Sequence, residues 1–222
     1  MKSGNWNDLA TRSVTGVVLA AVGLGAILSG GLWFTLLVVI AAIAMTWELL
    51  GMLRPALRQG KDRGIFVTYQ SAILLGCLGL IAAGDQGAGR LLFIVGLVVV
   101  TDILGYFAGR MFGGPKFWPA VSPKKTWSGT AAGWVGSAIL AYVYWPAAMS
   151  GFSLAGFVTL AVFLSFASQM GDIAESAIKR RAGVKDSSNL LPGHGGVMDR
   201  FDGMVGVGLL LWLVAEVQWI MG

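Results

Sequence analysis

The sequence predicts an all-α fold, a polytopic bundle of about seven transmembrane helices whose polar loops carry the chemistry. Three observations support this fold class. Hydrophobic residues make up 56% of the 222 residues and charged residues only 12%, whereas soluble domains carry about 25% charged residues. Long apolar runs recur along the whole chain, and most charges lie between them. No polar stretch is long enough for a separate soluble domain, so we expect residues 1–222 to form one integral-membrane domain.

Each apolar run approaches the length of about 20 residues that a helix needs to cross the hydrocarbon core of a bilayer. Backbone polar groups in lipid must be paired internally, which favours helices. The alternation expected of membrane strands is absent. The seven predicted spans are residues 14–29, 32–53, 67–84, 91–110, 128–147, 155–176 and 202–221. We expect residues 1–100 to supply N-terminal spans and residues 101–222 to form the catalytic half.

The loops between these spans differ sharply in basic residues. Fifteen of the sixteen Lys and Arg residues lie in the N-terminal segment or in the second, fourth and sixth loops, and Arg90 is the exception. The positive-inside rule places that side in the cytoplasm. The sequence therefore predicts a cytoplasmic N-terminus and a C-terminus on the other side. The net charge of +5 reflects this asymmetry, and we expect no nucleic-acid partner.

Acidic residues inside spans are functional candidates by default. Asp102 lies in the middle of the fourth span, with Tyr106 and Gly109 on the same helical face. Small residues on that face would let a helix or a ligand approach closely. A structural hydrogen bond or ion pair inside the bundle is the alternative for Asp102. For Glu48, near a cytoplasmic span end and within reach of Arg54, we expect a structural or interfacial role.

A second group of carboxylates lies at the cytoplasmic ends of the last two spans. Asp172 shares one helical face with Glu175, Ser176 and Lys179. Asp199 and Asp202 lie one turn apart at the start of the last helix. Carboxylates suit Mg²⁺, which is usually held by one or two of them together with substrate phosphates. This pattern predicts a metal site that includes Asp172 and Asp199, and a structural network between the two helices is the alternative.

The fourth and sixth loops contain residues suited to phosphate. In the fourth, Ser122, Lys124 and Lys125 precede a glycine that enters a helix, whose N-terminal amides would favour polyphosphate oxygens. An ordinary basic loop against anionic lipid headgroups is the alternative. The sixth loop offers basic residues, glycines that permit close backbone approach, and the only histidine as a catalytic candidate. These residues are Lys179, Arg180, Lys185, His194, Gly195, Gly196 and Arg200.

Three segments together resemble the phosphatidate cytidylyltransferases, also called CDP-diacylglycerol synthases. The longest runs from Ser176 to Asp202 and has the form Ser-x-Ile-Lys-Arg-x4-Lys-Asp-x-Ser-x2-Leu-Pro-x-His-Gly-Gly-x2-Asp-Arg-Phe-Asp, where this Leu corresponds to Leu191. The others are Asp102-x2-Gly-Tyr-x2-Gly-Arg110 and Ser122-Pro-Lys-Lys-Thr-Trp-Ser-Gly129. They cover the C-terminal half, whereas the first hundred residues are similar to the family only as hydrophobic spans.

The resemblance implies that CTP and phosphatidate react to give CDP-diacylglycerol and pyrophosphate with Mg²⁺, and a second cation could share the site. It implies a bacterial inner-membrane enzyme with a cytoplasmic active site, in contact with membrane lipid, and a homodimer is a candidate assembly. By this resemblance, Asp172 and Asp199 are the metal-binding carboxylates. The catalytic candidates are Asp102, Asp172, Lys185, His194 and Asp199. The substrate-binding candidates are Ser122, Lys124, Lys125, Ser176, Lys179, Arg180, Gly195, Gly196, Arg200 and Asp202.

Other functions remain alternatives at this stage. A CTP-dependent kinase of a polyprenol or phytol would also place CTP at a membrane site, but it would release CDP and a lipid phosphate. A CDP-alcohol phosphotransferase fits less well, since its Asp-x2-Asp-Gly-x2-Ala-Arg pattern is absent. A transporter using Asp102 and Asp172 within the bundle would move a solute without turning over CTP.

Overall fold

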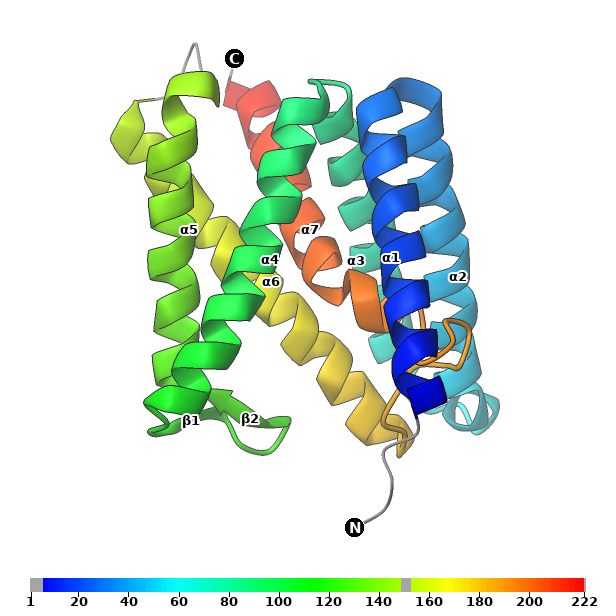
Figure 1. Cartoon of the computed structure of the whole chain (residues 1–222). Coiled ribbons are helices and arrows are strands. Elements are labelled where there is room, and N and C mark those ends of the chain that lie inside the picture. Colours follow the sequence, from blue (N-terminus) through cyan, green and yellow to red (C-terminus); the bar gives the residue numbers. More distant parts are fainter. Residues whose placement is uncertain (1–5, 149–152, 222) are drawn as a thin grey trace.

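The structure, a computed structural model, describes residues 6–148 and 153–221, and this part of the chain forms seven helices and one short hairpin (Figure 1). The first four helices are α1 (Trp6–Ser29), α2 (Gly31–Arg58), α3 (Arg63–Gly84) and α4 (Ala88–Met111). The hairpin consists of β1 (Lys116–Trp118) and β2 (Ser122–Thr126). The last three helices are α5 (Trp127–Ala148), α6 (Leu154–Ala182) and α7 (Met198–Met221). Each predicted span thus corresponds to one helix.

Five of these helices are long and apolar enough to cross a membrane: α1 from Ala10, α2, α3, α4 and α6. Their outward-facing side chains are largely apolar, as with Val17 and Leu32, each 68% exposed. Such exposure is costly in water but natural in lipid. The predicted all-α polytopic membrane fold is confirmed at this level.

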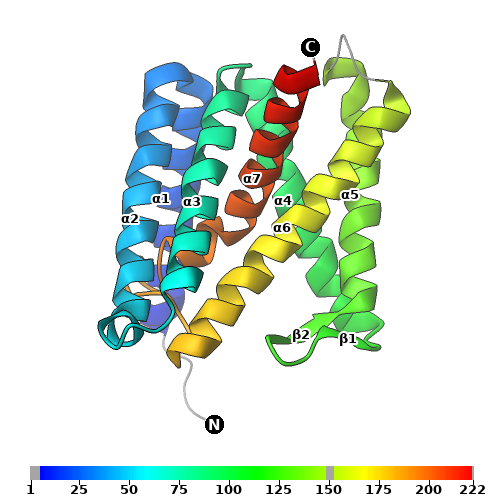
Figure 2. The ribbon, with the colours of Figure 1, turned by 180° about the vertical axis from the view of Figure 1, so that it is seen from behind.

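Close packing of α7 against its neighbours organises the bundle. α7 lies between α3 and α6, while α4 pairs with α5, and Figure 2 shows α6 crossing the bundle diagonally. α6 and α7 touch backbone to backbone, since a side chain at Gly171 would collide with the carbonyl oxygen of Asp202. Small residues at such crossings let membrane helices approach closely. This crossing brings the polar ends of α6 and α7 together.

Two features differ from the sequence-based prediction. The fourth loop, for which no strand was predicted, contains the antiparallel hairpin, in which Lys116 pairs with Thr126 and Trp118 with Ser122. The sixth helix extends beyond the predicted span of residues 155–176, since it continues to Ala182 and is followed by Gly183 with a left-handed φ of 71°. Basic side chains in the last helical turn interact favourably with the helix dipole, which explains why this charged segment stays helical.

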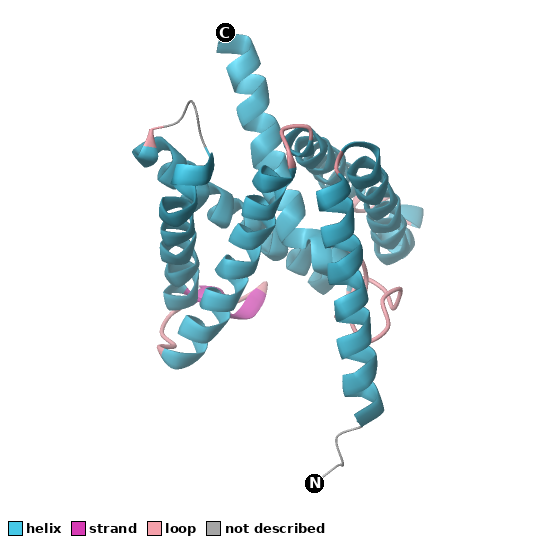
Figure 3. Cartoon of the chain, turned by 45° about the horizontal axis from the view of Figure 1, so that its top comes forward, coloured by secondary structure: helices cyan, strands magenta, loops and turns pink. Residues whose placement is uncertain are grey.

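The polar connections gather at one end of the bundle. The start of α1, the α2–α3 connection, the hairpin and the loop of residues 183–197 all lie at the lower end in Figure 1. Figure 3, tilted from that view, shows the strands and this last loop on the same side of the helices. The segments that hold fourteen of the fifteen basic residues in the described part of the chain therefore share one end, as the loop charges predict.

Candidate functional site

A polar cavity of about 640 Å³ lies where α4, β2, α5 and α6 meet. Its lining comes from four segments far apart in the sequence and includes several residues singled out above. These are Asp102, Gly105, Tyr106 and Gly109 of α4, Ser122, Lys124 and Lys125 of β2, and Asp172 of α6. The structure therefore joins the two shorter signature segments to Asp172, which lies one helical turn before the longest one.

Glycines allow the helices around this cavity to pack closely against one another. A side chain at Gly129 on α5 would lie 2.5 Å from the carbonyl oxygen of Gly105 on α4, so only a glycine fits there. On α6, Gln169 donates to the carbonyl oxygen of Thr130 at 3.2 Å and accepts from Trp134 Nε1 at 3.0 Å. These contacts hold α5 against α6, and they place the hairpin beside the carboxylates.

An ion pair links the hairpin to α6. Lys125 Nζ lies 2.6 Å from Asp172 Oδ2 and donates to the carbonyl oxygen of Gln169 at 3.3 Å. Both side chains remain accessible, with 24% of Lys125 and 36% of Asp172 exposed. Ser176 Oγ donates to the other carboxylate oxygen of Asp172 at 3.2 Å, as their shared helical face predicts. Because the pair is accessible, Asp172 could bind a cation and Lys125 could bind an anionic ligand.

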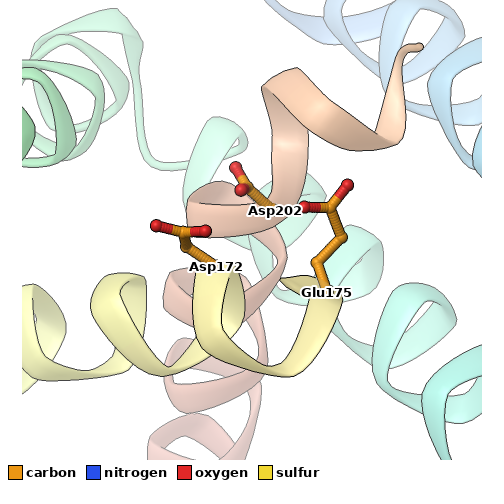
Figure 4. Close-up of side chains that lie close together, drawn as sticks. All are labelled: Asp172, Glu175 and Asp202. Carbon is orange, nitrogen blue, oxygen red and sulfur yellow. The ribbon is translucent and has the colours of Figure 1, made fainter. Parts of the chain in front are cut away.

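Three carboxylates meet at the crossing of α6 and α7. One oxygen each from Asp172, Glu175 and Asp202 lies within 4.8 Å of the others. Figure 4 shows Asp172 and Glu175 rising from α6 toward Asp202 on α7. We call these three residues the carboxylate cluster. Three hard oxygen ligands at this spacing suit a divalent cation such as Mg²⁺.

Glu175 is the most unusual member of the carboxylate cluster. Its side chain is fully buried, yet among the residues that the structure describes neither carboxylate oxygen has a hydrogen-bond partner. Lys179 Nζ lies 2.6 Å from Glu175 Oε2 as its ion-pair partner, and Oε1 has no polar partner among the described residues. A buried carboxylate without donors is costly. The arrangement therefore fits a cation that would neutralise these oxygens.

Asp199 is surrounded by donors from the chain itself. Its Oδ1 lies 2.6 Å from Lys179 Nζ, while its Oδ2 accepts from the amide and hydroxyl of Ser187 at 2.8 and 2.9 Å and from the Gly196 amide at 2.8 Å. Lys179 therefore bridges Asp199 to Glu175. Of the two predicted metal ligands, Asp172 lies in the carboxylate cluster, and Asp199 connects to it through this lysine.

The chain was compared with known proteins. A family model described as the cytidylyltransferase family matches residues 55–218. The chain belongs to the cytidylyltransferase family. A phosphatidate cytidylyltransferase of Brucella abortus is 34% identical over 263 aligned positions, which cover 95% of this chain and 94% of that protein. A protein of the same name from Staphylococcus saprophyticus is 32% identical over 89% of the chain and 78% of its own length. A third, from Bacillus subtilis, is 45% identical over 46% of the chain and 38% of its own length.

In this member of the cytidylyltransferase family, the loop of residues 183–197 is a folded structure. Leu191 and Gly195 form a β-bridge, and Gly193 and Gly195 adopt left-handed φ values of 72° and 83°. Arg200 donates through Nε and Nη2 to the carbonyl oxygen of His194 at 3.0 and 2.8 Å. The imidazole of His194 lies against α1, since a Cβ at Gly16 would be 3.5 Å from its Nε2. Arg200 therefore braces the loop.

The other predicted residues of the longest signature segment are either exposed at the surface or hydrogen-bonded inside the site. Arg180 and Lys185 are exposed, at the end of α6 and at the start of the loop. Gly196 is buried and donates its amide to Asp199. Asp202 belongs to the carboxylate cluster, and its Oδ1 accepts from the amide of Gly203 at 2.8 Å. The long signature segment thus supplies both exposed cations and internal braces.

Glu48 is a residue whose partners the sequence did not reveal. Its carboxylate, 1% exposed, accepts from the hydroxyls of Ser187 and Ser188 at 3.1 and 2.6 Å and from the amides of Val197 and Met198 at 2.8 and 2.7 Å. The structural role expected for Glu48 is correct, but its hydrogen bonds come from the loop of residues 183–197 and the first residue of α7. The only signal in the sequence was an acid within an apolar run.

Proposed function

We propose that this chain is a phosphatidate cytidylyltransferase, which converts CTP and phosphatidate into CDP-diacylglycerol and pyrophosphate. The observation that carries the proposal is the ion pair between Lys125 and Asp172. It joins a lysine-bearing hairpin, suited to a triphosphate, to the carboxylate cluster, suited to a cation. The names of the relatives point to the same substrates.

In the proposed reaction, a phosphate oxygen of phosphatidate forms a bond to the α-phosphorus of CTP. The bond from that phosphorus to the bridging oxygen of the β-phosphate breaks, and pyrophosphate leaves with the electron pair. Phosphoryl-type transfers depend mostly on positioning and charge neutralisation. Lys124 and Lys125 would bind the triphosphate in the polar cavity, and Ser122 would add a hydroxyl. Asp102 and Tyr106 line the same cavity and would orient the nucleotide.

The carboxylate cluster is the proposed site of a divalent cation, with Mg²⁺ as the expected ion. When bound, the cation would neutralise negative charge on the reacting phosphates. Asp172, Glu175 and Asp202 would hold it, and Ser176 orients Asp172 by its hydrogen bond. Asp199 would become available as a further ligand when a substrate phosphate draws Lys179 away. A second cation could then be accommodated.

The sixth loop would bind the phosphates that the hairpin does not. Arg180 and Lys185 are exposed cations near the end of α6 and would attract the anionic substrates. Gly195, Gly196 and Arg200 would maintain the loop conformation through the bonds described above. His194 would position or protonate a phosphate once α1 and the loop adjust to the substrate.

We infer that α5 and α7 cross the membrane together with the five helices of sufficient hydropathy, since both run beside them over much of the bundle (Figure 1). Seven spans and the clustered basic loops would place the N-terminus and the site in the cytoplasm, where CTP is present. The whole chain would be one membrane domain, its second half catalytic, in the inner membrane of a bacterium. A homodimer is a compatible assembly.

The test is an assay of purified protein in detergent with labelled CTP. We expect label in a CDP-lipid, with release of pyrophosphate, only when phosphatidate and Mg²⁺ are both present. Asp172→Asn should lower turnover by about 100-fold or more, because it removes a proposed metal ligand. Asp85→Asn, an exposed acid at the end of α3, is the matched control and should retain activity.

Formation of a lipid phosphate and CDP from a lipid alcohol would instead identify a kinase. Solute uptake into liposomes without CTP turnover would identify a transporter. Near-normal turnover by Asp172→Asn would refute the assignment of the site.

A further inference from the structure

A second cavity, of about 1050 Å³, lies between α3, α6 and α7. These helices are seen together on the face shown in Figure 2. Its walls are mainly apolar, with Ile65 and Ala72 from α3, Phe166 and Met170 from α6, and Leu209 and Leu213 from α7. Pockets for drug-sized ligands measure about 300–1,000 Å³. This apolar groove therefore has the volume for a large apolar ligand.

The apolar groove reaches the carboxylate cluster. Gly171 and Ala174 line the groove, and they directly precede Asp172 and Glu175 on α6. Val205 and Gly206 line it from α7, one turn after Asp202. The polar cavity takes Gln169 and Asp172 from the same stretch of α6. One helix thus separates a polar cavity from an apolar groove, with the carboxylate cluster between them.

The part of the apolar groove between the carboxylate cluster and the open rim is about as long as one leaflet of a bilayer. From Gly171 to Phe163, α6 rises by about 12 Å at 1.5 Å per residue. Half of the hydrocarbon core is about 15 Å. The rim residues Phe163, Phe166 and Leu213 are 58%, 39% and 46% exposed, so this end opens toward the lipid. At the other end lies Arg181, which is paired through Nε with Asp62 Oδ1 at 2.8 Å.

One polar atom on the groove wall lacks a partner. Tyr69 is only 7% exposed, and its hydroxyl has no hydrogen-bond partner among the residues that the structure describes. Buried tyrosine hydroxyls usually find such a partner. Tyr69 also lies near Glu175. Tyr69 therefore lines the apolar groove near the carboxylate cluster, where a ligand would turn from apolar to polar, and its buried hydroxyl is available to such a ligand.

We propose that the apolar groove binds an acyl chain of the phosphatidate substrate. The lipid enters sideways between α6 and α7, its phosphate reaches the carboxylate cluster, and Tyr69 donates to an ester oxygen of its glycerol. The Arg181–Asp62 pair closes the cytoplasmic end, so the chain extends toward the open rim. This inference rests on the proposed function, because it takes the lipid substrate from there.

The test is photo-cross-linking of the full chain in detergent, without CTP, using phosphatidate that carries a diazirine on its acyl chain. We expect the label on peptides of α3, α6 and α7 that line the apolar groove. Ala72→Trp places an indole in the groove and should reduce this labelling at least fivefold. Ala82→Trp makes the same change at an exposed position of α3 outside the groove, and it should leave labelling unchanged.

A second variant makes the test independent of the bulky substitution. Tyr69→Phe removes one hydroxyl and should raise the KM for phosphatidate about fivefold, as expected for one lost hydrogen bond, while the KM for CTP stays the same. An equal rise in both KM values would contradict the role given to Tyr69.

Even labelling of all helices, or full labelling of Ala72→Trp, would overturn the groove assignment. So would loss of a dimer in Ala72→Trp with labelling intact, because the groove would then be a subunit interface. Binding is read without turnover, so failure of the groove and failure of the proposed reaction are separate results. Groove labelling in a protein that makes no CDP-lipid would contradict only the reaction.

Discussion

Glu48 and Glu175 are both buried acids in long helices, but the structure surrounds them in opposite ways. Glu48 is 1% exposed and receives four hydrogen bonds, three from the loop of residues 183–197 and one from the amide of Met198 at the start of α7. Glu175 is 0% exposed and receives none from the described residues, with Lys179 as its ion-pair partner. A buried charge is tolerated when donors replace its lost water, and it is costly otherwise. The comparison separates a carboxylate that holds the loop in place from one that we propose as a cation ligand.

The largest effect on stability is expected when Glu48, the hydrogen-bonded acid of this comparison, is substituted. In Glu48→Gln, an amide nitrogen would face groups that donate to the carboxylate, so at least one buried donor loses its acceptor. We expect a loss of about 3 kcal/mol in the free energy of unfolding. For a chain of this size, that corresponds to a fall in Tm of roughly 6–12 °C. Scanning fluorimetry in detergent measures it, and an unchanged Tm would show that Glu48 does not anchor the loop.

The same substitution at Glu175 should give the opposite pattern. Glu175→Gln removes a buried charge and leaves Lys179 paired with Asp199, so we expect Tm to stay the same or rise by a few degrees. Turnover should fall by roughly 10- to 100-fold, since a proposed cation ligand is lost. Tm and turnover are measured on the same preparation. A drop in Tm as large as that of Glu48→Gln would show that Glu175 is only a structural residue.

A cation titration sharpens the distinction further. Mg²⁺ should raise the Tm of the unaltered protein, because a ligand that binds only the folded state stabilises that state. At a Mg²⁺ concentration of 100 times the Kd, the free energy of unfolding rises by about 2.7 kcal/mol. Adding EDTA should reverse the shift. Glu48→Gln should keep the shift from its lower starting point, and Asp172→Asn should lose most of it. Equal shifts in all three proteins would place the cation elsewhere.

Features that depend on residues close together in the sequence were predicted, and features that depend on distant residues were not. Apolar runs predicted the helices well, because crossing lipid requires length and hydropathy that are read locally. The helical face shared by Asp172 and Ser176 was likewise predictable from spacing, and their hydrogen bond confirms it. The hairpin was not predicted, because strands of three and five residues rich in lysine carry little signal of their own.

Glu48 shows why the remaining contacts could not be predicted. Its partners lie 139 to 150 residues away, and two of them are backbone amides with no residue-type signature. The same holds for Lys179, whose bridge from Glu175 to Asp199 depends on how α6 crosses α7. A shared face on one helix does not determine which residues of a second helix it meets.

The ion pair of Asp62 with the exposed Arg181 provides the smallest effect and a third environment for the comparison. Asp62 precedes α3, where the hydrogen bond from Arg181 holds its pKa below the ordinary value of 3.8. A carboxyl with a lowered folded-state pKa contributes stability above its unfolded pKa, and this contribution is lost as the pH falls through the folded pKa. Asp62→Asn keeps a residue that tolerates the left-handed φ of 60°. We expect its Tm to be lower by at most about 2 °C near pH 7, since exposed pairs contribute little. The difference from the unaltered protein should vanish as the pH falls below 3.8. A difference that grew toward acid pH would have the wrong sign for this ion pair and would assign the Tm change to backbone strain.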